Sequence, residues 1–321
     1  MKGTPVSTTH PPAQSTPARP TSRSRPAPRA RRLGHGSFGY VFFAPFLVVF
    51  AIGIAAPLGY AAYLSFFQDR LVGGNVFVGF DNYTRALGDE LFRAGLWRVT
   101  LFLLVQVPVM LALALLAALA IDSGRLRWPA LFRIGIFVPY AVPAVVASLM
   151  WGYLYGDRFG LIRQVGDALH VDVPRLLSES WMLASIGNVV TWEFVGYNML
   201  ILYAALRTVP QELYEAAEVD GAGELRKAWS IKLPALRPAL ALATVFSIIG
   251  TFQLFNEPNV MQSLAPDVIS TSYTPNMYAF NLAFNGQQFN YSAAVAVVLG
   301  GVTAVVAYAV QARSMRKEQS L

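Results

Sequence analysis

Long runs of apolar residues, separated by short polar stretches, dominate the sequence from about residue 40 onward. An α-helix needs about 20 apolar residues to cross a hydrocarbon core of about 30 Å. Runs of that length predict six membrane-spanning helices. Their expected ranges are 40–66, 99–121, 134–156, 181–206, 238–260 and 291–312. The pattern therefore predicts an all-α integral membrane protein.

The composition supports a membrane protein and excludes several other classes. Hydrophobic residues make up 55% of the 321 residues and charged residues 13%, about half the charged fraction of a typical soluble protein. The chain has no cysteine, which excludes disulfides, thiol catalysis and cysteine-ligated metal sites. No lysine follows a glycine, so a Walker phosphate loop is absent from the sequence. We expect no catalytic residue, no metal site and no cofactor on this chain, which is not expected to be an enzyme.

Residues 1–37 differ from the rest, because they are rich in Pro, Ser, Thr and Arg. A segment with so few apolar side chains is expected to be a disordered cytoplasmic tail, and residues 38–321 are expected to form the six-helix transmembrane domain. A signal peptide would place its apolar core close behind a short basic start, so the first hydrophobic segment is expected to be retained. The arginines of the tail fit a topology signal better than a nucleic-acid site, and no nucleic-acid partner is expected.

The distribution of positive charge predicts the orientation. Cytoplasmic loops of membrane proteins carry an excess of Lys and Arg. With the N-terminus in the cytoplasm, six crossings return the C-terminus there, and the lysines at positions 2, 227, 232 and 317 all fall on the cytoplasmic side. The connection between the fifth and sixth predicted helices has neither Lys nor Arg. The expected topology is therefore N-in and C-in.

The predicted cytoplasmic segment 208–234 is not a simple connector. Thr208 and Gln211 are spaced as in a capping box, which predicts the start of a short helix. Gly221 and Gly223 follow and allow the backbone to reverse. A second short helix is expected to end before the proline from which the fifth span begins. The segment is thus expected to be a helix–turn–helix joined to two membrane spans.

The first of these short helices has a surface suited to a protein partner. Ala216 and Ala217 offer a bare helix face, and Glu215, Glu218 and Asp220 add charges for pairing. The alternative interpretation is an amphipathic connector that lies on the lipid headgroups, because such helices are common between spans.

The order of residues in this segment resembles the EAA loop of binding-protein-dependent ABC import permeases. Glu215-Ala216-Ala217 is followed by Gly221, then by Ile231, Leu233 and Pro234. Three other segments are similar to the sugar-permease branch, of the maltose and oligosaccharide type, and the resemblance covers about residues 38–313. These segments are Phe77 to Tyr83, Phe132 to Pro139 and Tyr273 to Phe280.

The resemblance implies a type I importer bundle in a bacterial cell membrane (the inner or plasma membrane) that moves sugar by alternating access. Its implied partners are a second homologous permease subunit, two cytoplasmic ATPase subunits that hold the ATP and magnesium, and an extracytoplasmic sugar-binding protein. In the family, the EAA loop is a coupling helix pair that docks on the ATPase. The residues that the resemblance assigns to docking are Glu215, Ala216, Ala217, Glu218, Asp220, Gly221 and Ala222.

Polar residues within the predicted spans mark a candidate substrate path, because charges are costly inside a bilayer. Glu193 falls near the middle of the fourth span. Gln253, Asn256 and Glu257 in the fifth are spaced to share one helical face. Buried polar side chains also bridge neighbouring helices, so a purely structural role is the alternative. The candidate path residues are Asn188, Glu193, Tyr197, Asn198, Gln253, Asn256 and Glu257.

The main alternative function is a self-contained, proton-coupled secondary transporter with Glu193 or Glu257 as the proton carrier. Such carriers usually contain paired repeats with broken helices, and no convincing internal repeat is visible. A membrane-embedded enzyme would need a cluster of catalytic side chains at one depth, which the sequence does not show.

Overall fold

The structure is a computed structural model that describes residues 3, 35–70 and 72–318. It divides into two units, Met1–Gly53 and Ile54–Leu321, and each is described by itself. In the first unit, helix α1 (His35–Phe50) leads into a π-helical turn, η1 (Ala51–Ala55), within which the division falls. The predicted tail lies outside the described residues, apart from residue 3 and the first residues of α1.

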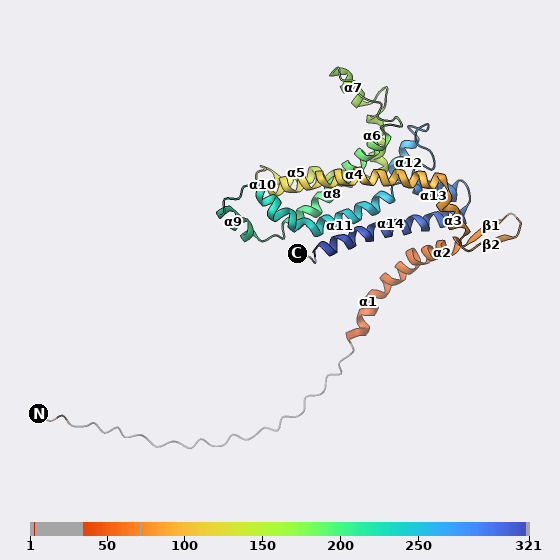
Figure 1. Cartoon of the computed structure of the whole chain (residues 1–321), viewed down its shortest axis with the longest axis horizontal. Helices are drawn as coiled ribbons and strands as arrows, with labels where there is room; N and C mark the ends of the chain where they lie inside the picture. Colours follow the sequence, from red (N-terminus) through yellow and green to blue (C-terminus); the bar gives the residue numbers. More distant parts are fainter. Residues whose placement is uncertain (1–2, 4–34, 71, 319–321) are drawn as a thin grey trace. The chain divides into compact units, whose positions relative to one another are not determined.

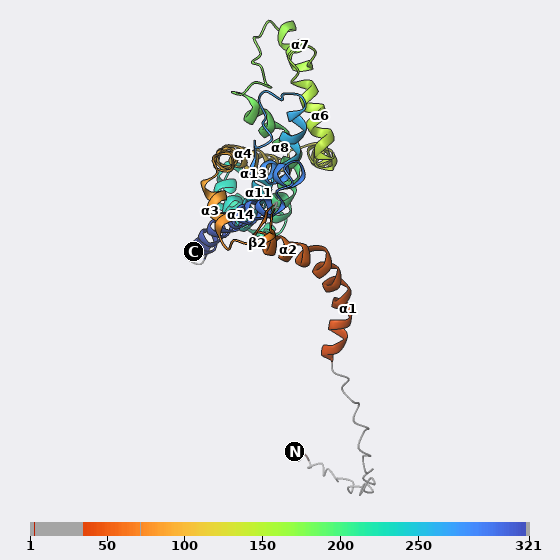
Figure 2. The same cartoon turned by 90° about the vertical axis from the view of Figure 1, so that its right-hand side faces the viewer.

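The second unit is a helical bundle with short elements at both of its ends (Figures 1 and 2). The bundle helices are α2 (Ala56–Leu64), α4 (Glu90–Asp122), α5 (Pro129–Phe137), α8 (Met182–Leu206), α11 (Leu233–Phe252) and α14 (Phe289–Glu318). The short elements are β1 (Phe67–Arg70), β2 (Gly74–Phe77), α3 (Asp81–Gly88), η2 (Val138–Ala141), α6 (Ala144–Leu154), α7 (Leu161–Ala168), α9 (Gln211–Val219), α10 (Glu224–Lys227), η3 (Ala228–Lys232), α12 (Asn256–Gln262) and α13 (Pro275–Phe284).

The two ends of the bundle carry different structures. Helices α9 and α10, together residues 211–227, form an elbow at the end where α14 also finishes, which we call the elbow end (Figure 1). Strands β1 and β2 pair as an antiparallel hairpin at the opposite end, the hairpin end. This hairpin was not expected in an all-α chain. Gly73 in its turn and Gly74, the first residue of β2, both have positive φ.

The described residues contain five helices long and apolar enough to cross a membrane, or up to six if one bent pair counts as a single span. The fourth span, predicted at 181–206, is observed as α8, Met182–Leu206. Helices α4, α8 and α14 run toward the elbow end, whereas α2, α5 and α11 run toward the hairpin end. This alternation is what six successive crossings require.

The third predicted span is not the continuous helix expected over residues 134–156. Helix α5 passes into η2, and the chain then turns by 98° before α6 begins. Pro143 has no N–H to donate and disfavours helical backbone at Val142, which is extended with ψ of 128°. The helix is therefore broken at the proline, and α6 packs against α8 and α12 instead of extending α5.

Small residues set the closest packing in the bundle. Ala114 and Ala118 of α4 are completely buried against Met199 and Leu202 of α8, next to the elbow end. Because the hydrophobic effect does not drive helices together in lipid, they associate through close packing, which small side chains permit. Gly196 of α8 lies so close to α5 that an added Cβ would overlap the α5 backbone at Ile136.

A single carboxylate ties three elements together at the hairpin end. Asp89 caps α4, because its Oδ1 accepts the backbone N–H groups of Leu91 and Phe92 at 2.9 and 3.2 Å. Its Oδ2 accepts the hydroxyl groups of Tyr278 on α13 and Tyr291 on α14, at 2.6 and 2.8 Å. Burial alone would raise the pKa of the Asp89 carboxyl, but these hydrogen bonds outweigh it and hold that pKa below its ordinary value.

Replacing Asp89 with Asn is expected to destabilise the bundle by about 1–2 kcal/mol at pH 7, because the amide accepts fewer hydrogen bonds than the carboxylate. A lowered carboxyl pKa stabilises the fold above the ordinary value of 3.8, and that contribution is lost as the pH falls through the folded-state pKa. The melting-temperature gap between the native chain and Asp89→Asn should therefore be large at pH 7 and shrink below about pH 3.8. A gap that is independent of pH would contradict this role.

Candidate functional site

The elbow begins differently from the prediction. The expected capping box at Thr208 and Gln211 is wrong, because the Thr208 hydroxyl donates to the Ala205 carbonyl of α8 at 2.8 Å. Pro210 precedes the first residue of α9 instead, with extended backbone. The fourth span and the elbow are therefore separated by only four residues, 207–210.

The turn of the elbow depends on one glycine. Gly221 has φ of +74°, its N–H donates to the Glu218 carbonyl at 2.9 Å, and the Ala222 N–H donates to the Ala217 carbonyl at 2.8 Å. This pair of bonds is a Schellman motif, in which glycine is favoured at the left-handed position. The expected reversal at Gly221 is confirmed. Gly223 has φ of −71°, so the turn does not require a glycine there.

The surface of the elbow is charged and apolar at once. Glu215, Ala216, Glu218, Asp220 and Gly221 are exposed, while Ala217 and Ala222 are half-buried by the turn. Large apolar side chains surround these residues and are also exposed. They are Leu213 at 51%, Val219 at 89%, Leu225 at 75% and Trp229 at 68% exposure. Exposed apolar side chains gathered on a polar element indicate a surface for a protein partner.

The elbow is also rigid internally. The Lys227 ammonium is buried and forms ion pairs with Glu218 of α9 at 2.7 Å and Glu224 of α10 at 2.8 Å. It therefore connects the two helices of the elbow. The predicted break before Pro234 is absent, because α10 continues through the π-helical turn η3 directly into α11.

A cavity of about 380 Å³ lies inside the bundle, where two broken helices meet. The break between α5 and α6 contributes Tyr140 and Ala144, and the break between α11 and α12 contributes residues 253–257. Helices α4, α8 and α11 supply the remaining walls, including Gln106, Met110, Phe194, Asn198 and Gly250. Non-helical backbone at membrane depth is tolerated where it lines a cavity or is buried in protein.

The predicted helical stripe in the fifth span does not form. Helix α11 ends at Phe252, Phe255 is non-helical with φ of −144°, and α12 starts anew at Asn256. Gln253, Asn256 and Glu257 nevertheless all line the cavity. They are brought together by the break rather than by helical periodicity.

The predicted residues of α8 separate into two groups. Tyr197 and Asn198 line the cavity, and the Tyr197 ring stacks on Tyr140 with centroids 4.9 Å apart. Asn188 lies elsewhere, where its amide donates to the Tyr155 hydroxyl at 2.7 Å, as expected of a helix-bridging residue. Glu193 is 3% exposed and does not line the cavity, and its carboxyl group lies near that of Glu257.

The walls of the cavity include a residue that the prediction missed, Gln106 of α4. Its amide nitrogen contacts Thr191 Oγ1 and Met110 Sδ, both at 3.4 Å, but its Oε1 is buried. Among the described residues that line the cavity, Gln106 Oε1 and Asn198 Oδ1 are buried acceptors that receive no hydrogen bond. Buried polar atoms are normally paired, so two free acceptors beside one cavity suit a ligand rich in hydroxyl donors. The sequence did offer one signal for Gln106, because it is the single glutamine in an otherwise apolar predicted span.

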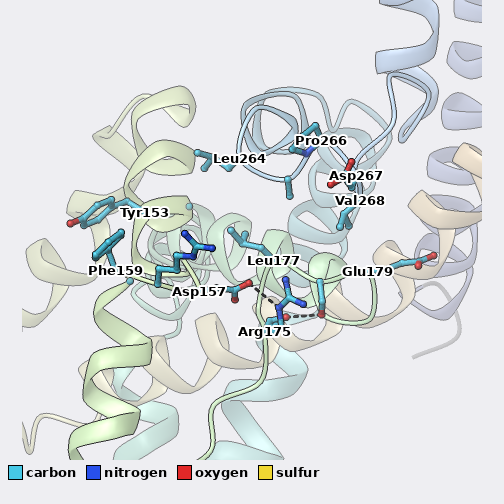
Figure 3. Close-up of a pocket in the computed structure, with 16 residues that line it drawn as sticks. Tyr153, Asp157, Phe159, Arg175, Leu177, Glu179, Leu264, Pro266, Asp267 and Val268 are labelled. Atoms are coloured by element: carbon cyan, nitrogen blue, oxygen red, sulfur yellow. Dashed lines mark hydrogen bonds and ion pairs between the residues drawn. The ribbon is translucent and has the colours of Figure 1, made fainter.

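A second hollow, of about 600 Å³, lies between α6 and the segments 157–160, 175–179 and 264–268 (Figure 3). The Arg175 guanidinium and the Asp157 carboxylate form an ion pair of 2.9 Å at its wall. None of the predicted path residues lines this hollow. It is therefore separate from the cavity between the broken helices.

The chain matches the sequence profile of binding-protein-dependent transport system inner membrane components over residues 110–317. This chain belongs to that family. It is therefore a multi-pass inner-membrane transport subunit that works with a substrate-binding protein, and it is not an enzyme.

Two named relatives and one solved structure are similar to this chain over most of its length. The sulfoquinovosyl glycerol transport permease SmoG of Agrobacterium fabrum is 31% identical over 83% of this chain and 87% of its own length. The diacetylchitobiose uptake permease NgcF of Streptomyces coelicolor is 33% identical over 93% and 89%. A bacterial importer of the acidic polysaccharide alginate has the same fold, with a TM-score of 0.76 at 18% identity over 87% of this chain and 95% of that one.

Proposed function

We propose that this permease subunit imports a sugar or oligosaccharide, powered by a separate ATPase that docks on the elbow. The observation that carries the proposal is the rigid elbow, whose exposed apolar and acidic side chains are joined to both α8 and α11 with almost no flexible linker. A sugar substrate is supported by the names of the relatives, which transport sulfoquinovosyl glycerol and diacetylchitobiose.

The proposed docking surface comprises the seven residues implied by the EAA resemblance. Glu215 and Glu218 are exposed on α9 and available for pairing with basic residues of a partner. The neighbouring Ala216 has no bulk to keep that partner away. The exposed apolar residues Val219 and Leu225 would be buried on docking, which stabilises an interface by about 25 cal/mol per Å² of apolar area.

The proposed substrate path runs through the cavity between the broken helices. Tyr197 and Tyr140 offer aromatic faces, while Asn198, Gln253, Asn256 and Glu257 offer acceptors and donors. A sugar presents both hydroxyl groups and apolar ring faces, and this cavity matches both. Glu193 supports the path indirectly through Glu257, and Asn188 is assigned to helix bridging instead.

The proposed assembly follows from the single elbow on each chain, to which one ATPase subunit would bind. A second homologous permease would complete the pore, and two cytoplasmic ATPase subunits would bind one elbow each and hold the ATP and magnesium. The elbow end then faces the cytoplasm, in agreement with the charge bias that predicts N-in and C-in. ATP-driven closure of the ATPase pair would move both elbows and open the bundle outward, toward the sugar-binding protein.

Replacing Gln106 with Leu is expected to lower the maximal rate of sugar uptake by about tenfold, because a sugar hydroxyl loses its acceptor, at about 1.4 kcal/mol. The measurement is uptake by reconstituted transporter at saturating binding protein. Thr303→Val is the matched control, because the Thr303 hydroxyl bonds only the Leu299 carbonyl of its own helix. Equal uptake rates for the two variants would contradict a role of Gln106 in the substrate path.

The overall proposal is tested by sugar uptake into proteoliposomes. Uptake should require this chain, its partner permease, the ATPase, the binding protein and ATP together. Uptake by this chain alone, driven by a pH gradient, would overturn the proposal and favour the proton-coupled carrier.

A further inference from the structure

The end of α4 carries a charge that its own helix disfavours. Asp122 is the last residue of α4, where the partial negative charge of the helix terminus repels a carboxylate. The Lys232 ammonium lies 2.7 Å from its Oδ2 and compensates that charge. The two side chains are only 11% and 7% exposed, so this ion pair is largely removed from water.

Lys232 lies at the junction between the elbow and α11. It is the last residue of the π-helical turn η3, which joins the elbow to α11 without a loop. Short π-helical segments are rare and are frequent at functional sites. Asp122 and Lys232 therefore connect the junction of the elbow and α11 to the end of α4, a helix 110 positions earlier in the chain.

The other helix of the elbow reaches the same point. The ring of Tyr214, on α9, lies under the Lys232 ammonium at 5.4 Å from its centroid. The Tyr214 hydroxyl is buried, and this burial, followed by the negative charges of Asp122 and Glu224, raises the pKa of the phenol. All of these groups line one hollow of about 540 Å³.

The two helices joined by this pair both line the proposed substrate cavity. Helix α11 contributes Phe246, Gly250 and Thr251, and it moves with the elbow because the two are continuous. Helix α4 contributes Gln106, sixteen residues or about 24 Å from Asp122. Its covalent link to the elbow is indirect. Helix α4 also packs on α11 through apolar side chains such as Leu236 and Ala243, and the buried ion pair adds a polar contact at the junction itself.

We propose that Lys232 and Asp122 form a strut that transmits movement of the elbow to α4, so that α4 and α11, which both line the cavity, move together. The pair acts as positioning residues for coupling. This inference rests on the proposed docking of an ATPase at the elbow. An exposed pair such as Arg163–Asp167 on α7, at 40% and 65% exposure, exchanges readily with water and would transmit little.

The test measures sugar transported per ATP hydrolysed by the reconstituted importer. Lys232→Met and Asp122→Asn should still copurify with the ATPase and hydrolyse ATP. The ratio of sugar to ATP should fall by about tenfold, in the usual range of coupling between sites. A merely structural pair would lower the amount of assembled protein and leave the ratio unchanged, which would overturn the inference.

The controls separate charge, folding and docking. Arg237→Met removes an exposed cation of α11, five residues after Lys232. This variant should keep the native ratio of sugar transported to ATP hydrolysed. The exchanged pair Asp122→Lys with Lys232→Asp should restore the ratio, and it carries the test if the single variants do not fold. If the exchanged pair assembles but its ratio of sugar to ATP stays low, the result would contradict the strut. Failure of the unmodified chain to bind the ATPase would instead contradict the docking proposal.

Discussion

Replacing Gly221 with Val is expected to abolish ATP-driven uptake while leaving membrane insertion intact. Gly221 has φ of +74°, and a β-branched residue is strained in that conformation. No atom lies within 4 Å of the position of an added Cβ, so the effect would come from the backbone and not from a clash inside the chain. The turn would open and the docking residues would lose their arrangement. Uptake and the amount of inserted protein are the two measurements.

Gly221→Asn is the matched control at the same position. Asparagine adopts left-handed backbone far more readily than valine, so this variant should keep the Schellman turn and most of the transport. Normal transport by Gly221→Val would show that the angle of the elbow does not matter. Equal loss in both variants would indicate that any side chain at this position blocks docking.

Replacing Gly196 with Ala is expected to destabilise the bundle by about 3 kcal/mol and to reduce the yield of folded protein. The added Cβ would overlap the Ile136 carbonyl oxygen and approach the Phe137 Cα to 2.7 Å. Both are backbone atoms that cannot rotate away as a side chain can. Helices α5 and α8 would have to separate, which also disturbs Tyr140 at the cavity. The melting temperature in detergent measures the effect.

Gly187→Ala provides the comparison on the same helix. There the nearest atom to an added Cβ is in the Phe102 ring at 3.5 Å, an ordinary contact with a movable side chain. This variant should melt close to the native temperature. A Gly196→Ala protein that melts at the same temperature as Gly187→Ala would contradict the close approach of α5 and α8.

The existence of the long helices was predictable from the sequence, whereas their breaks and several of their ends were not: α4 begins at Glu90, nine residues before its predicted start. The range of α8 was correct to one residue at its start, because an uninterrupted apolar run has few other solutions in a membrane. The break at Pro143 was missed because proline is tolerated in membrane helices, as Pro108 is in α4. Composition does not distinguish a proline that is tolerated from one that ends a helix.

The candidate sites differ in how much the sequence revealed. The turn at Gly221 was predictable because glycine spacing reports local backbone geometry. The cavity was only partly predictable, because its walls come from four segments distant in sequence. Asn188 was turned toward Tyr155, and Gln106 was brought into the cavity, by tertiary packing alone. The ion pair of Asp122 and Lys232 likewise depends on where α4 ends and where η3 passes into α11.

The most direct test of the account is photo-cross-linking from the elbow in the assembled, transporting complex. The chain has no cysteine, so Ala216→Cys places a single labelling site on the exposed face of α9. Val72→Cys, 91% exposed at the hairpin end, is the control. The account predicts a conjugate with the ATPase from position 216 and none from position 72. Active transport with no conjugate at position 216 would contradict it.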